Sequence, residues 1–163
     1  MRRSPPDRPP PPLMPGIVVA SRFRVERVHH LGGGHVVPVA RDEETGEEVS
    51  LKVGRLSDPT HGAIHAVEVR ALSRLHHPNV ARLVAHGVCA ETELRYLAIE
   101  HVAGLTLQRF VDLHAPVGPA NLRVMGLGLA AALAEIHRRG SPCRACSTRT
   151  TWSWAGSAGC GGR

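Results

Sequence analysis

The sequence predicts an α+β fold in the middle of the chain, between residues 17 and 140. The first observation is a change of pattern: strand-like alternation gives way to helical spacing, returns to strands and then becomes helical again, with short polar turns between. The second is composition, because 42% hydrophobic residues in a chain of 163 are enough for one core of ordinary domain size. We therefore expect five strands and three helices, with the first strands antiparallel.

The first three strands are joined as hairpins. Residues 23–31 alternate as a strand, three glycines follow, and residues 36–41 form the next strand before the turn signal DEETG. The third strand, 48–53, contains Lys52, the single lysine of the chain. Glycine lets backbone N–H groups approach a ligand closely, and lysine supplies a compact positive charge. A glycine loop above Lys52 therefore suits a phosphate chain.

A helix is predicted over residues 61–76, ended by Pro78. Its apolar stripe recurs at helical spacing and consists of Ala66, Val69, Leu72 and Leu75. Glu68 lies beside this stripe, where it either pairs with Lys52 and directs the ammonium toward a ligand, or is a solvated surface residue. His61 and His65 lie on one face of the same helix, and a solvated helix start explains them as well as a metal site does.

Two strands, 80–88 and 94–99, follow the first helix, with the turn AETE between them. Two helices come next, a short one over 106–113 and a longer one over 119–139. The longer helix is apolar on two faces, so it requires burial on most sides. Residues 141–163 contain no Leu, Ile, Val, Met or Phe that could cover it.

The two flanks differ from the middle in composition. Residues 1–16 are dominated by proline without hydrophobic periodicity, and we expect a disordered or polyproline arm. Residues 141–163 are expected to be an unstructured tail. Cys143 and Cys146 in this tail have CxxC spacing but lack the further ligands of a zinc site and the strand and helix of a redox site. We expect no metal site.

Charge and hydropathy exclude several classes of function. The net charge is +6 and the pI is about 10.1, but the excess arginines lie in the flanks and the middle carries both signs. No basic stripe with interleaved aromatic residues results, so we expect no nucleic-acid partner. The chain has no apolar run of roughly 18 residues and no signal peptide, so we expect a cytoplasmic protein without a membrane partner.

From about Arg22 to Gly140, these segments resemble the bacterial eukaryotic-like (Hanks-type) serine/threonine protein kinases. The matching strings are VSLKV, EVRALSRLHHPNV, YLAIEHVAGLTL and LAAALAEIHRRG. The resemblance implies a protein-kinase-like N-lobe, in which one helix packs on a five-stranded antiparallel sheet, followed by an incomplete C-lobe. N-lobe and hinge would cover residues 17–103, and the first C-lobe helices would cover residues 104–140.

The same resemblance implies an ATP site. Lys52 would contact the α- and β-phosphates, Glu68 would be its ion-pair partner, and Ile99 would be the gatekeeper. The backbone from Glu100 to Val102 would hydrogen-bond adenine. The remaining expected nucleotide contacts come from the glycine loop and from the strand under the adenine, and are Gly32, Gly33, Gly34 and Ser50.

Three departures from the family pattern affect this site. The family loop is GxGxxG, whereas LGGGHVV has His35 or Val37 where the last glycine belongs. Pro38 removes a ladder donor from a strand expected to have neighbours on both sides. Ser50 replaces the usual alanine and adds a hydroxyl group. We therefore expect ATP to bind weakly.

The HRD, DFG and APE motifs do not occur in the 163 residues. They supply the catalytic base, the metal-binding positions and the activation segment, so the resemblance implies an inactive fragment truncated before the catalytic loop. Mg²⁺ would take part only if a C-lobe were present. The alternatives are a non-catalytic, pseudokinase-like interaction module and a decayed gene product.

The tail offers an explanation for the missing motifs. In a shifted frame, the codons of residues 146–155 permit Leu, His, Pro, Asp, Asn, Leu, Val, Val and Gly, which resembles the kinase catalytic loop and next strand. We therefore interpret residues 141–163 as a frame-shifted C-lobe. The uncovered helix at 119–139 would then bind a protein partner or drive self-association.

Overall fold

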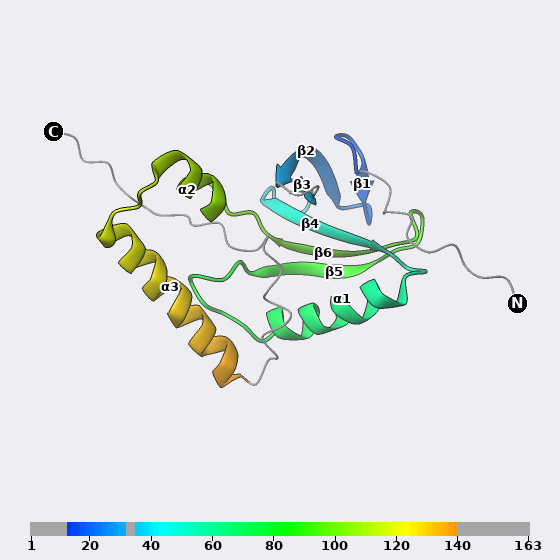
Figure 1. Cartoon of the computed structure of the whole chain (residues 1–163). Coiled ribbons are helices and arrows are strands. Elements are labelled where there is room, and N and C mark those ends of the chain that lie inside the picture. Colours follow the sequence, from blue (N-terminus) through cyan, green and yellow to red (C-terminus); the bar gives the residue numbers. More distant parts are fainter. Residues whose placement is uncertain (1–12, 32–34, 140–163) are drawn as a thin grey trace, which may run out of the picture. The chain divides into compact units, whose positions relative to one another are not determined.

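The computed structural model describes residues 13–31 and 35–139. Three of our expectations lie outside the described residues: most of the proline-rich arm, the glycines Gly32 to Gly34, and the tail at 141–163 with its CxxC pair and its shifted frame. The described residues confirm the α+β class, with one antiparallel sheet and three helices (Figure 1).

The sheet has six strands in the order β1-β2-β3-β4-β6-β5, each antiparallel to its neighbours. The strands are β1 Val18–Val19, β2 Phe23–Leu31, β3 His35–Asp42, β4 Glu48–Arg55, β5 Leu83–Cys89 and β6 Leu94–Glu100. Five were expected, and β1 is an addition. It pairs with β2 through a turn in which Ala20 and Ser21 have positive φ, and two residues are too few to show a sequence period.

Side chains on one face of the sheet form a hydrophobic core. Along β4, the residues that join this core alternate with Ser50 and Lys52, which therefore face the opposite side. The buried members of the core are Leu13, Val19, Phe23, Val25, Ala40, Val49, Leu51, Cys89, Leu94 and Ala98.

The turn between β3 and β4 is organised around a buried carboxylate. Asp42 accepts two hydrogen bonds from the Arg22 guanidinium, at 2.8 and 2.7 Å, and its side chain is fully buried. The Glu44 backbone N–H and the Thr45 hydroxyl also donate to it, each at 3.1 Å. Gly46 completes the turn with φ +76°, a conformation that favours glycine.

Pro38 does not lie in a strand with neighbours on both sides. It pairs with Val28 of β2, but the ladder between β3 and β4 runs only from Val39 to Arg41. Our expectation of a lost donor inside a doubly paired strand was therefore wrong, because β3 and β4 are no longer paired with each other at Pro38.

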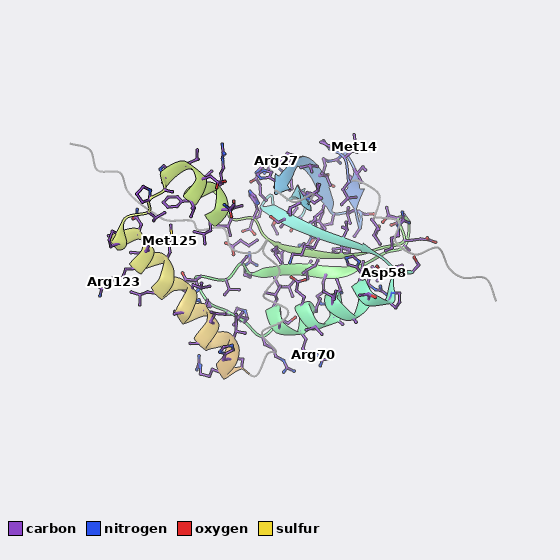
Figure 2. The ribbon with its side chains drawn as sticks, viewed as in Figure 1. Met14, Arg27, Asp58, Arg70, Arg123 and Met125 are labelled. Atoms are coloured by element: carbon purple, nitrogen blue, oxygen red, sulfur yellow. The ribbon has the colours of Figure 1, made fainter. Side chains whose placement is uncertain are left out.

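Helix α1, Pro59–Leu72, begins two residues earlier and ends four residues earlier than expected. Asp58 lies at its start (Figure 2) and accepts hydrogen bonds from the Thr60 and His61 N–H groups, so it acts as the N-cap. At the other end, the N–H groups of Arg74 and Leu75 bond to carbonyls three residues back, which ends the α-helical ladder before Pro78. The start of β5 is later than expected because a turn occupies residues 77–80.

The chain divides into two compact units. The described residues up to Val69, with Leu83–Glu100, form the first unit, and Arg70–Arg82 with the described residues from His101 onward form the second. The second unit contains α2, Leu107–His114, capped by the Thr106 hydroxyl, and α3, Pro119–Arg138.

Within the second unit, the loop after α1 is tied to α3. The Asn79 amide donates a 3.0 Å hydrogen bond to the carbonyl of Gly128 in the middle of α3. A side chain at Gly128 would place a Cβ 3.3 Å from that amide, so glycine permits the close approach. Arg139, next to the end of α3, donates to the Arg74 carbonyl and pairs with Glu135.

We find no helix in the described part of the chain that is long and apolar enough to cross a membrane.

Candidate functional site

The centre of the candidate site is an ion pair between β4 and α1. The Lys52 ammonium pairs with the Glu68 carboxylate, and their side chains are only 25% and 13% exposed. The alternative of a solvated Glu68 is therefore excluded. An ammonium carries three N–H donors, so pairing with one carboxylate oxygen leaves it able to donate to a phosphate oxygen as well.

The strand register places two further expected residues beside this pair. Ser50 lies directly opposite Ile99, and Lys52 lies opposite Leu97. Because side chains alternate along a strand, Ser50, Lys52 and Ile99 share the face of the sheet that Glu68 approaches. Ile99 is 6% exposed. The first unit thus brings together four of the expected site residues on one surface.

The remaining expected residues, Glu100, Val102 and the three glycines, are not tested by this geometry. Glu100 is exposed at the end of β6, and Val102 belongs to the second unit. The glycine loop, Gly32 to Gly34, lies outside the described residues.

His65 makes a contact with the sheet that the sequence analysis does not predict. We considered it only together with His61, as a metal ligand or as part of a solvated helix start. In the structure its Nε2 lies 3.0 Å from the backbone carbonyl of Tyr96 in β6. The signal that could have identified it is its spacing, since it stands three residues before Glu68 and therefore on the same helix face.

Comparison with known proteins shows which proteins the chain is similar to in sequence. No family model matches the chain. The kinase PrkC of Bacillus subtilis is 26% identical over 129 residues, and pkn3 of Myxococcus xanthus is 32% identical over 128. The chain is a relative of the bacterial Hanks-type serine/threonine protein kinases. Each alignment covers 77% of the chain but only 20% and 23% of the two relatives, so the chain spans about a fifth of their length.

Solved structures agree with the sheet and helices described above. The kinase domain of Mycobacterium tuberculosis PknI matches with a TM-score of 0.65 at 20% sequence identity. The match covers 78% of this chain and 52% of the PknI chain, and it shows that the two share a fold. The described residues therefore have the architecture of a kinase N-lobe with part of a C-lobe.

Proposed function

We propose that the chain is the nucleotide-binding lobe of a serine/threonine kinase domain and that it binds ATP. The observation that carries this proposal is the ion pair between Lys52 and Glu68, on the same sheet face as Ser50 and Ile99. In this assignment Lys52 binds the α- and β-phosphates, and Glu68 holds its ammonium in place. Ile99 and the backbone from Glu100 to Val102 border the adenine.

The chain as given binds ATP weakly and does not transfer phosphate by itself. Phosphoryl transfer depends on positioning and on charge neutralisation by Mg²⁺. The HRD and DFG motifs that supply the base and the metal ligands are not among these 163 residues. Magnesium therefore adds little to the affinity, and the metal has a role only together with a C-lobe that supplies its ligands.

Calorimetric titration of the chain with ATP, with and without Mg²⁺, tests this function. We expect Lys52→Ala to weaken ATP binding roughly tenfold or more, because a charge-assisted hydrogen bond to phosphate is lost. The matched control is Arg70→Ala, which removes an exposed positive charge from α1. Equal ATP affinity in Lys52→Ala and in the unaltered chain would contradict the proposal. Lys52-dependent phosphorylation of the chain or of a protein substrate would contradict the second part of the proposal, that the chain does not transfer phosphate by itself.

A second function, binding of a protein partner, is favoured by exposed aliphatic side chains on two sides of α3. Four large aliphatic side chains of α3, Leu122, Val124, Leu127 and Leu129, are between 42% and 61% exposed. In this alternative, a non-catalytic module uses α3 to bind a second copy of the chain or another protein.

A further inference from the structure

The part of helix α1 in the first unit, up to Val69, makes polar contacts with the sheet, and the buried residues of the helix, Ala71 and Leu72, belong to the second unit. The hydrophobic core of the first unit contains no described residue of α1. Up to Val69, the half-buried positions of the helix are Gly62, His65, Glu68 and Val69, of which one is aliphatic. The larger aliphatic residues Ile64 and Val67 are instead 50% and 40% exposed. Apolar burial therefore does little to fix the rotation of this part of the helix about its axis.

Along one face of α1, hydrogen bonds and an ion pair fix the rotation of the helix. At the start of α1, the Arg95 guanidinium donates to the carbonyls of Arg55 and Asp58, and it lies where a Gly62 side chain would be. One turn further on is the His65 contact, followed one turn later by Glu68.

The contact of His65 has a fixed acceptor. Tyr96 is paired on both sides, with Val53 of β4 and Gly87 of β5, so its carbonyl is held in place by two neighbouring strands. A carbonyl only accepts, so the His65 Nε2 must carry the hydrogen and donate it. Both the neutral ring with Nε2–H and the protonated ring can do so.

The two contacts of the helix face occupy neighbouring positions on the sheet. Tyr96 is opposite Val53, and the next register pair along β4 joins Lys52 to Leu97. His65 and Glu68 are likewise adjacent on the helix surface, one turn apart. Lysine has a long flexible stem, so its ion pair alone tolerates many helix positions. The short, rigid imidazole on a fixed carbonyl restricts both the rotation and the sliding of α1.

We propose that His65 is a positioning residue that sets the rotation of α1 and so keeps Glu68 against Lys52. Its consequence for ligand binding rests on the function proposed above. Loss of the His65 donor lets Glu68 move away from Lys52, and the ammonium is then no longer held for a phosphate group.

Because Lys52 is the single lysine, its environment can be measured directly. Labelling the full chain with [¹⁵N]lysine gives one side-chain ammonium signal, and Glu68→Gln supplies its position when the pair is broken. We expect His65→Leu to move this signal most of the way to the Glu68→Gln position. His65→Gln, which keeps an amide donor of similar reach, should leave it near its original position.

Two further variants complete this test. His65→Asn is polar, but its amide is one methylene too short to reach the carbonyl, so it should shift the signal like His65→Leu. His86→Leu is the matched control, because this exposed histidine of β5 lies beside His65 with ring centroids 6.4 Å apart. Variants are compared only after circular dichroism shows the native spectrum. An unshifted Lys52 signal in folded His65→Leu or His65→Asn would overturn the proposal, as would the same shift in His65→Gln or His86→Leu.

Titration with ATP separates this inference from the proposed function. If both hold, His65→Leu binds ATP roughly fivefold more weakly than the unaltered chain, and His65→Gln restores the affinity. If the Lys52 signal responds as expected while the unaltered chain does not bind ATP, positioning by His65 stands and the nucleotide function fails. If Lys52→Ala weakens ATP binding but His65→Leu changes neither the signal nor the affinity, the nucleotide function stands and the role of His65 is wrong.

Discussion

Asp42 shows how one buried side chain can order a turn and make stability depend on pH. Hydrogen bonds from the Arg22 side chain are the main cause that lowers the pKa of Asp42 to about 2, and donors from Glu44 and Thr45 act in the same direction. An aspartate in the unfolded chain has a pKa near its ordinary value of about 3.9. The unfolded state therefore binds more protons between these two values, and stability rises with pH in that window.

We expect the free energy of unfolding to fall by about 2 kcal/mol as the pH drops from above 4 to below 2, owing to Asp42. Urea unfolding at a series of pH values measures this. Asp42→Asn should lower stability at pH 7 by at least about 2 kcal/mol, because Arg22 then loses a charged acceptor, and should flatten the acid dependence. The control Asp112→Asn changes an exposed carboxylate on α2. A slope in Asp42→Asn equal to that of the unaltered chain would rule out this origin.

Residues differ in how well the sequence predicts their contacts. Lys52 and Glu68 were assigned as partners by resemblance to kinases, whereas spacing alone left a solvated Glu68 open. His65 could not be assigned because its acceptor is a backbone carbonyl 31 residues away, and a backbone acceptor leaves no trace in residue type. The Arg22 and Asp42 pair was missed because it joins two hairpins and has no local period.

At the scale of elements, the strands were predicted well where one face is buried. Alternation in β2 and β4 gave their positions to within two residues, since inward and outward side chains differ in hydropathy there. The end of α1 was predicted less well, because the apolar residues Leu72 and Leu75 continue a helical spacing while the backbone between them is a tight turn. Leu72 and Leu75 can both be buried by a continued helix or by a tight turn, so the spacing of apolar residues does not distinguish the two conformations.

The loop after α1 gives a prediction for one connection between elements. Asn79 donates to Gly128 of α3, two residues that are 49 positions apart in the sequence. Asn79→Asp keeps the shape but replaces the donor with a charged acceptor facing a carbonyl, so we expect a loss of about 1 kcal/mol or more in the free energy of unfolding. His76→Asn is the control at an exposed position of the same loop. Unchanged denaturation midpoints in Asn79→Asp would show that this hydrogen bond does not hold the loop to α3.

At the scale of the whole chain, the first unit contains a buried hydrophobic core, whereas α3 in the second unit leaves several large aliphatic side chains exposed. The buried residues of α3 are Ala132, Glu135 and Ile136, all in its second half. The exposed aliphatic residues, Leu122, Val124, Leu127 and Leu129, lie mainly in the first half and on two sides of the helix. Full burial of a large aliphatic side chain contributes about 1.5–3 kcal/mol, so covering four half-exposed ones would contribute on the order of 4 kcal/mol. That is enough to favour association at high protein concentration.

We therefore expect the 17.5 kDa chain to show a concentration-dependent rise in mass by light scattering. The double variant Leu122→Glu and Leu127→Glu should return the mass toward that of a monomer, because two charges would have to be buried on association. Ile64→Glu is the matched control, since Ile64 is an equally exposed aliphatic residue on α1. A chain shortened to end near Gly104 should also associate less, but it loses the partner of Asn79 along with the exposed residues of α3, so the double variant is the sharper test. A clean monomer at every concentration would show that α3 does not drive self-association. A mass lowered equally by Ile64→Glu would place the contact on α1 as well.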